Sequence, residues 1–322
     1  MSDRKQFYAV DCRWKGKEAA TKYHANSHNL ARKKLSVCTY LMEASCTVLS
    51  IRQVESIMLY DTIGKTYSQT RQSDPRITAK LLEILEPFQA STIVDIGAGT
   101  GSYALYLAEH RYQVLAVEPS TVMRRQAIAH PAVRWIDAKA EHLSLPSHSA
   151  DVAIIILALH HFPDYSQALQ EIHRVTGGGQ VVIFTYDPDL ISSFWLTEYF
   201  PSFIADVQST FVPIATLTAE IETLMDTAVN IVPFPLPNDL SDSFAAVGWG
   251  CPELYLEHNI RNGISSFTKL NEDKLEQGLS SLCNDLETGI WDQKHEYLRQ
   301  KTYYDVGYRF VYTSKRIRPK ID

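Results

Sequence analysis

Short apolar runs alternate with amphipathic stretches through the middle of the chain. Five runs have the length and composition of buried strands: Thr92–Ile96, Val114–Val117, Val133–Ile136, Val152–Leu157 and Gln180–Thr185. Apolar residues at helical spacing predict helices at Pro75–Leu85, from Ser102, near Val122–Ala129 and at Tyr165–Val175. Alternating units of this length require a parallel sheet with right-handed crossovers and helices on both faces. The pattern therefore predicts an α/β fold with a doubly wound, mostly parallel sheet.

The second half of the chain predicts a helical cap on this sheet. Residues 190–228 have a helical pattern rich in aromatic residues, and residues 239–300 are again mostly helical. Ile231–Leu236 and Val306–Tyr312 predict further strands. We therefore expect a main domain at residues 57–322, with cap insertions at about 190–228 and 239–300.

The first 56 residues predict a small separate module. Strand-like stretches, the first at Phe7–Trp14 and the last at Thr47–Val54, accompany a helix from His28 to about Tyr40, which gives the order ββαβ. Residues 1–60 carry a charge balance of +5, whereas the whole chain carries −6. We therefore expect residues 1–56 to form a basic accessory module beside an acidic main domain.

Composition excludes several classes of protein. The five cysteines form no Cys-x-x-Cys pair, which disfavours both a disulfide scaffold and a zinc ribbon, and we expect no metal site. No apolar run approaches the roughly 20 residues of a membrane helix. A net charge of −6 also disfavours nucleic-acid binding by bulk electrostatics. We expect a cytoplasmic protein without membrane contact.

The segment Ile93–Tyr103 carries the strongest functional signal. An apolar strand runs directly into glycines at positions 97, 99 and 101, after which a helix begins, so that backbone N–H groups can approach a ligand. Glu118 ends the next strand, where a carboxylate can accept hydrogen bonds from both ribose hydroxyls. Asp95 would repel the pyrophosphate of a dinucleotide but attract the ammonium and sulfonium of S-adenosylmethionine. The pattern therefore favours S-adenosylmethionine over a nicotinamide cofactor.

Several motifs in order make residues 93–187 resemble a class I S-adenosylmethionine-dependent methyltransferase of the small-molecule kind called type 11. The motifs are Val94-Asp-Ile-Gly-Ala-Gly-Thr-Gly101, Val117-Glu-Pro119, Ala140-Glu-His-Leu143, Ala150-Asp-Val152, Leu159-His-His-Phe162 and Glu171-Ile-His-Arg-Val175. Tyr60–Tyr67 with Arg71 resembles the helix that covers the cofactor in that family. The resemblance implies a Rossmann-like sheet and S-adenosylmethionine as the cofactor.

The resemblance also implies which residues hold the cofactor. The glycines would line its methionine and ribose part, Glu118 would hold the ribose hydroxyls, and Ala140 and Glu141 would lie at the adenine edge. The family often has an acid directly before this Ala-Glu pair, whereas this chain has Lys139. The complete expected set is Tyr67, Arg71, Asp95, Gly97, Gly99, Gly101, Glu118, Ala140, Glu141 and Leu157.

Three residues are candidates for catalysis because they follow strands at the carboxyl edge, where ligands bind in open α/β sheets. His160 and His161 follow the fourth strand, and one of them could be the general base for a hydroxyl or an amine. The alternative is that they start a helix and only line the pocket. Asp187 follows the fifth strand and either orients a cationic substrate or is a turn aspartate before proline.

The function expected from these features is methyl transfer from S-adenosylmethionine to an oxygen or nitrogen atom of a small molecule. One alternative is a nucleic-acid methyltransferase that docks through residues 1–56, although no Asn/Asp-Pro-Pro-Tyr/Phe motif follows strand four. Another is a non-catalytic methyltransferase-like binding protein, which the intact set of Asp95, glycines and Glu118 disfavours. The sequence indicates neither the substrate nor the oligomeric state.

Overall fold

The computed structural model describes residues 73–178 and 180–314 of the 322-residue chain. The predicted module at residues 1–56, together with Tyr67 and Arg71, lies outside the described residues. The ββαβ module and the cofactor contacts of Tyr67 and Arg71 therefore remain predictions.

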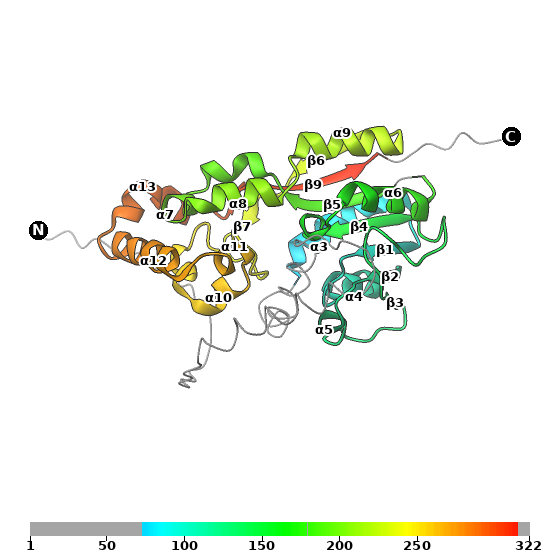
Figure 1. Ribbon diagram of the computed structural model, residues 1–322, viewed down its shortest axis with the longest axis horizontal. Helices are drawn as coiled ribbons and strands as arrows, with labels where there is room; N and C mark the ends of the chain where they lie inside the picture. The colour runs from blue at the N-terminus through cyan, green and yellow to red at the C-terminus, as the bar shows by residue number, and fades with distance from the viewer. Residues whose placement is uncertain (1–72, 179, 315–322) are drawn as a thin grey trace, which may run out of the picture. The chain divides into compact units, whose positions relative to one another are not determined.

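Seven strands form a single sheet (Figure 1). They are β1 (Thr92–Ile96), β2 (Gln113–Val117), β3 (Val133–Ile136), β4 (Val152–Ile156), β5 (Val181–Tyr186), β6 (Val229–Pro233) and β9 (Tyr308–Thr313). Their order across the sheet is β3-β2-β1-β4-β5-β9-β6. The first five strands pair in parallel, whereas β9 runs antiparallel to β5 and β6. The predicted Rossmann-like, doubly wound and mostly parallel α/β sheet is confirmed.

Helices cover both faces of the sheet. Successive residues of a strand point to opposite faces, so neighbouring residues belong to different buried clusters. Ile93 belongs to one buried apolar cluster, which includes residues of α3 (Pro75–Leu85) and α4 (Ser102–Glu109). Its neighbour Val94 belongs to a second cluster, with α6 (Tyr165–Thr176) and α9 (Ile214–Met225). With both faces covered, a ligand can reach the sheet at its carboxyl edge, where the strand order reverses between β1 and β4.

The helix expected near Val122–Ala129 is shorter than predicted. Helix α5 runs only from Thr121 to Arg124, and Met123 is the residue that it buries. The side chain of Ile128 is 68% exposed, so further helical turns would bury no apolar surface there. Met123 is therefore buried as its spacing predicts, whereas Ile128 is not.

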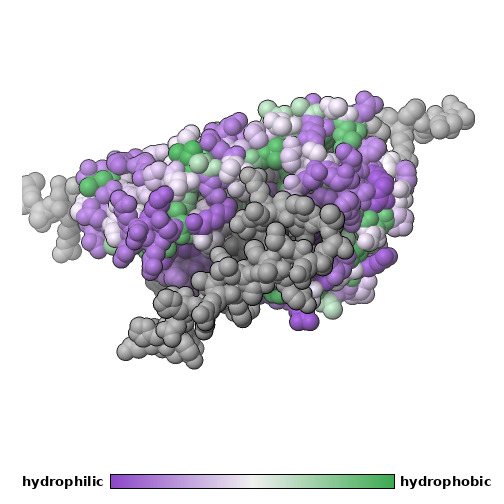
Figure 2. All heavy atoms as spheres, in the orientation of Figure 1, coloured by the Kyte–Doolittle hydropathy of each residue, from purple (hydrophilic) through white to green (hydrophobic). Residues whose placement is uncertain are grey.

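A helical cap follows β5 and continues to β9. Its elements are η3 (Pro188–Ser193), α7 (Leu196–Tyr199), α8 (Ser202–Thr210), η4 (Pro252–Leu256), α10 (His258–Asn262), α11 (Ser265–Thr268), α12 (Glu272–Glu287) and α13 (Ile290–Arg299). In Figure 1, α10, α12 and α13 gather at the opposite side of the view from α4 and α5. Mainly hydrophilic residues cover the cap on the face shown in Figure 2, so its apolar side chains are directed inward.

The predicted cap region contains two features that its helical pattern does not indicate. Helix α9 lies within residues 190–228 but packs on the sheet. Residues 238–251, here called the cap loop, contain no helix, and a two-residue strand before them, β7 (Leu236–Pro237), pairs with β8 (Tyr303–Tyr304). The backbone of the cap loop is held by buried side chains, since the indole N–H of Trp195 donates to the carbonyl of Trp249 over 2.9 Å.

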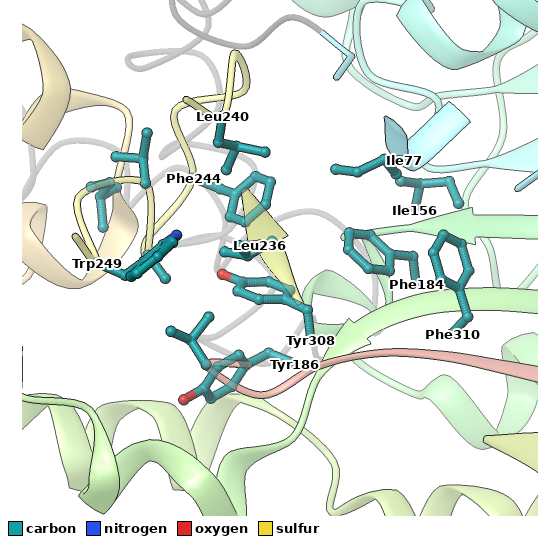
Figure 3. Packing of buried hydrophobic residues seen from close by; sticks show 14 of the residues in the cluster. Ile77, Ile156, Phe184, Tyr186, Leu236, Leu240, Phe244, Trp249, Tyr308 and Phe310 are labelled. Atoms are coloured by element: carbon teal, nitrogen blue, oxygen red, sulfur yellow. The ribbon is translucent and has the colours of Figure 1, made fainter. Parts of the chain in front are cut away.

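Aromatic residues join the cap to the sheet (Figure 3). Phe244 of the cap loop lies beside Tyr308 of β9, with ring centroids 4.7 Å apart. On the sheet, the ring of Tyr308 packs against the rings of Phe184 and Tyr186, with centroid distances of 5.7 and 5.1 Å. Burial of several aromatic rings at one junction fixes the cap loop against the carboxyl edge of β5.

A hydrogen-bonded latch also holds the cap loop, three residues before Phe244. The fully buried carboxylate of Asp74 caps α3 by accepting from the backbone N–H of Arg76, and it also accepts from the Ser241 backbone N–H and hydroxyl at 3.0 and 3.1 Å. Burial acts to raise the pKa of Asp74, but hydrogen bonds from Arg76 and Ser241 outweigh it and lower the pKa to about 2. Residues 167 positions apart are thereby joined.

We predict that Asp74→Ala lowers the free energy of unfolding by about 2–4 kcal/mol at neutral pH, because it removes a helix cap and leaves a buried N–H without a partner. The folded pKa lies below the unfolded value, so this stabilisation is present above about pH 4 and declines as the pH falls toward about 2. Urea unfolding at several pH values measures it. Glu83→Ala, at an exposed ion pair with Lys80, is the control and should change stability by less than about 1 kcal/mol.

Candidate active site

A cavity of about 510 Å³, here called the first cavity, opens at the carboxyl edge of the sheet beside β1, β2 and β4. Its walls include Asp95, the turn that follows β1, Glu118 after β2, and the segment from Asp137 to Glu141. Leu157, directly after β4, completes one side. The structure thus brings together residues from four separate loops, as expected from the shared edge of parallel strands.

Two glycines of the turn after β1 have no room for a side chain. Gly97 has a φ of +76°, and a Cβ there would lie 2.6 Å from that of Ala158. Gly101 has a φ of +83° and caps α4, and a Cβ there would lie 2.6 Å from the Trp135 ring. The turn is tied to β2, because the carbonyl of Val117 accepts from the N–H groups of Gly97 and Ala98 at 2.9 and 3.0 Å.

Gly97 and Gly99 line the first cavity, whereas Gly101 does not. The role of Gly101 in the structure is to begin the helix and to pack against Trp135. A direct contact between Gly101 and a ligand therefore stays a prediction, whereas its contribution to the shape of the turn is observed.

Glu118 is held by the backbone of two residues that line the first cavity. Its carboxylate accepts from the N–H of Gly99 at 3.0 Å and from the N–H of Ser120 at 2.8 Å. The side chain of Arg124 donates to the Glu118 carbonyl. Burial raises the pKa of Glu118, although these backbone hydrogen bonds and the charge of Arg124 oppose the rise. The carboxylate is thus fixed at the end of β2, within reach of a ligand in the first cavity.

Asp95 is a buried carboxyl group with an unsatisfied oxygen. Its side chain is 2% exposed, and its Oδ2 atom has no hydrogen-bond partner among the described residues. Burial, followed by the charge of Glu118, raises the pKa of Asp95 to about 7. A carboxylate in this state is stabilised by a cation that enters the cavity, because the cation supplies both a donor and an opposite charge.

The segment after β3 forms the opposite wall. Ala140 and Glu141 are buried, and Glu141 accepts from the backbone N–H of Asp164 at 3.3 Å. Lys139 lies on the same wall, and Asp137, two positions earlier, is bound by Arg124 at 2.7 Å. Asp137 was not singled out from the sequence. Its position directly after β3 was the available signal.

The cap contributes one acid to the first cavity. Asp242 lies in the cap loop, one residue after Ser241, and its side chain is 2% exposed. The latch between Asp74 and Ser241 determines where this part of the loop lies. Sequence reasoning missed Asp242, because no local spacing connects it to β1.

A second cavity of about 100 Å³ shares Leu157 and His161 with the first. His160 lines the second cavity only and stacks on Phe211, with ring centroids 4.3 Å apart. Leu157 has a φ of +51°, a left-handed conformation that is strained for a branched side chain and recurs at functional sites. Of the three residues predicted for catalysis, His161 therefore lies where the two cavities meet, and His160 lies in the second cavity alone.

The third residue, Asp187, lines neither cavity. Its side chain accepts from the backbone N–H of Asp189 at 3.2 Å and caps η3. Burial raises the pKa of Asp187, while the hydrogen bond from Asp189 opposes this rise. This hydrogen bond favours the interpretation of Asp187 as a turn aspartate before proline.

Comparison with known proteins identifies the family. Residues 94–184 match a family model described as a methyltransferase domain. A solved structure from Anabaena variabilis, described as that of a methyltransferase from an antibiotic biosynthesis pathway, is 43% identical with a TM-score of 0.72, and the match covers 76% of this chain and 99% of that one. The chain belongs to the class I S-adenosylmethionine-dependent methyltransferases. Its cofactor is S-adenosylmethionine.

Curated members of the family match over shorter stretches. An uncharacterized methyltransferase of Mycobacterium tuberculosis is 31% identical over 120 residues, which is 36% of this chain and 61% of the relative. A malonyl-[acyl-carrier protein] O-methyltransferase of Pseudescherichia vulneris is 34% identical over 116 residues, 36% of this chain and 45% of the relative. The chain thus spans about half of the curated relatives that it matches.

The first cavity fits the chemistry of the methyltransferase cofactor. The unsatisfied, buried carboxyl oxygen of Asp95 suits its ammonium group, and at Gly97, where a Cβ would clash with Ala158, the backbone itself lines the cavity. Among the described residues, no group of three or more potential ligands is arranged to hold a metal ion. None of the helices in residues 73–178 and 180–314 has the length and apolar character needed to cross a membrane.

We predict that Glu118→Ala weakens the binding of S-adenosylhomocysteine by about ten- to hundredfold, or about 1.5–3 kcal/mol, because it removes a charge-assisted contact to the ribose. Isothermal titration calorimetry measures the change. Glu109→Ala, an exposed acid at the end of α4, is the matched control. Equal affinity in the Glu118 variant and the wild type would remove the ribose assignment.

We predict that S-adenosylhomocysteine binds about tenfold more tightly at about pH 8 than at about pH 6, because its ammonium group requires ionised Asp95. The unliganded fold has the opposite dependence. The folded pKa is raised above the unfolded value, so stability is lost as the pH rises from about 4 to about 7. Titration in buffers of different ionisation enthalpy should detect proton release. Asp95→Asn should flatten both profiles, and an unchanged slope would contradict the assignment.

Proposed function

We propose that this methyltransferase transfers a methyl group to an oxygen or nitrogen atom of a small molecule. The observation that carries the proposal is the pair of adjoining cavities, which share Leu157 and His161. One cavity suits the cofactor and the other suits an acceptor. A relative named as an O-methyltransferase supports an oxygen acceptor.

The residues of the first cavity would orient the cofactor. In this proposal, Glu118 accepts from the ribose hydroxyls, Asp95 pairs with the ammonium group, and Ala140 and Glu141 border the adenine. Bound S-adenosylmethionine supplies a methyl group that its sulfonium already activates. The protein therefore needs mainly to align the two reactants and to exclude water.

His161 is the proposed proton acceptor. It lines both cavities and lies in η2 (Leu159–His161), which begins three positions after the last residue of β4, and histidine is a common general base. A ring nitrogen of His161 would take the proton from the hydroxyl or amine of the acceptor as the new bond forms. His160 has a different role in this proposal, because its ring forms part of the wall with Phe211.

The cap would close the site against water. Phe244 and Ala246 of the cap loop, together with residues of α8 and of the α10–α11 connection, line the second cavity. Their apolar side chains surround the place where the acceptor would lie. Exclusion of water there strengthens the electrostatic interactions of the reacting groups and prevents side reactions.

The test is formation of S-adenosylhomocysteine by the full chain with labelled S-adenosylmethionine and a panel of phenols, alcohols and amines. We predict that His161→Gln lowers kcat by about a hundredfold and removes the fall in rate at low pH, because the proton acceptor is lost. Affinity for S-adenosylhomocysteine should stay within about threefold of the wild type.

His258→Gln is the matched control, since His258 lies in α10 and lines neither cavity. Transfer to no member of a broad panel, despite tight cofactor binding, would count against an active transferase. Equal kcat in the His161 variant and the wild type would instead remove the proton-acceptor role and leave the transfer itself in place.

A further inference from the structure

The second cavity has an apolar wall without formal charge. Among the described residues that line it, none is Asp, Glu, Lys or Arg. Phe194, Phe203 and Phe211 supply aromatic surface, and the polar groups are hydroxyls and the two histidine rings. A charged ligand would lose its hydration in this cavity, and no Asp, Glu, Lys or Arg side chain among the described lining residues would offer it an opposite charge. The wall therefore disfavours charged acceptors.

The size of the second cavity limits what can enter. Its volume is about 100 Å³, and an apolar cavity of about 150 Å³ holds one benzene molecule. Because the second cavity is smaller than that, it has room for at most a single ring or a short branched alkyl group. Two fused rings would need the cap to shift.

Tyr186 places one unsatisfied hydroxyl in this apolar setting. The side chain is 5% exposed, lines the second cavity, and its Oη atom has no hydrogen-bond partner among the described residues. Burial raises the pKa of Tyr186, so the phenol stays neutral and can both donate and accept. A buried hydroxyl without a partner is unfavourable, and a ligand with a hydrogen-bonding atom would relieve it.

The surroundings of Tyr186 hold its ring in one position. Tyr308 and Phe211 pack edge-on at 5.1 and 5.7 Å between ring centroids. Gly307 lies against the ring with a φ of +117°, and a Cβ there would stand 2.9 Å from Tyr186 Cε2. The view in Figure 3 displays Tyr186 and Tyr308 next to each other at the end of the sheet, beside Phe244 of the cap loop. The packing around the ring therefore also fixes the position of the Tyr186 hydroxyl.

We propose that the second cavity selects an uncharged acceptor whose buried part is no larger than one ring, and that Tyr186 orients this acceptor through a hydrogen bond. The inference rests on the proposed function, because it takes the second cavity as the acceptor site. It adds a substrate class and a specificity-determining residue. Neither follows from the family, since the cap residues that form the wall lie outside the matched residues 94–184.

The experiment measures ligand binding to the full chain saturated with S-adenosylhomocysteine, by ligand-observed nuclear magnetic resonance. The probes share a phenol ring: 4-methylphenol is neutral, tyramine is cationic, 4-hydroxybenzoate is anionic, and 2-naphthol is neutral with two rings. We expect 4-methylphenol to bind at least about tenfold more tightly than each of the other three. Equal or tighter binding of a charged probe, or no binding of 4-methylphenol up to its solubility, would overturn the proposal.

Two variants locate the site. Tyr186→Phe should weaken binding of 4-methylphenol by about five- to tenfold and leave the affinity for S-adenosylhomocysteine unchanged, since one hydrogen bond is lost. Ala246→Leu should abolish binding by filling the cavity. Tyr297→Phe removes an exposed hydroxyl and is the matched control. Wild-type affinity in the Tyr186 variant would overturn its orienting role.

Failure of the inference and failure of the proposed function give different results. Methyl transfer to a charged acceptor, with no effect of Tyr186→Phe, would support the proposed function and overturn the inference. Selective binding of 4-methylphenol without transfer to any acceptor would overturn the proposed function and support the selectivity of the cavity.

Discussion

Two buried acids at the ends of neighbouring strands set the electrostatics of the whole site. Asp95 is nearly inaccessible, Glu118 is buried beside it, and the charge of each is expensive in that environment. Glu118 is supported by backbone N–H groups, whereas one oxygen of Asp95 has no such support among the described residues. A cationic ligand would supply the partner that the Asp95 carboxyl group lacks, which is why we expect cofactor binding to release a proton.

The two cavities are formed by different parts of the molecule, the first mainly by the sheet and the second mainly by the cap. Loops at the carboxyl edge of β1 to β4 form most of the first cavity, and these belong to the part that matches the methyltransferase model. Residues of the cap, from η3 to α11, form most of the second cavity. Leu157 and His161 are the points where the two meet. In this arrangement, the cofactor site can stay constant while the acceptor site differs between relatives.

The sequence predicted the sheet and much of the first cavity because those features are local. The apolar runs correspond to β1 to β5, and Gly97 and Glu118 follow strands at a spacing that chemistry constrains. Asp242 and Tyr186 were not singled out, since their positions depend on tertiary contacts such as the latch at Asp74. Asp187 has the right place in the order of strands, but a local hydrogen bond turns its side chain toward its own helix.

The insertion of β9 between β5 and β6 has a consequence for how the protein is made. β9 follows every cap helix in the chain, and its partner β5 is more than a hundred residues earlier. During synthesis, the edge of β5 that pairs with β9 therefore stays unpaired until the cap has been made. Closing so long a loop also has an entropic cost. The apolar residues of β5, buried in the finished sheet, are open to aggregation during that interval. Early folding of the cap would shorten the effective loop and bring β9 to its place.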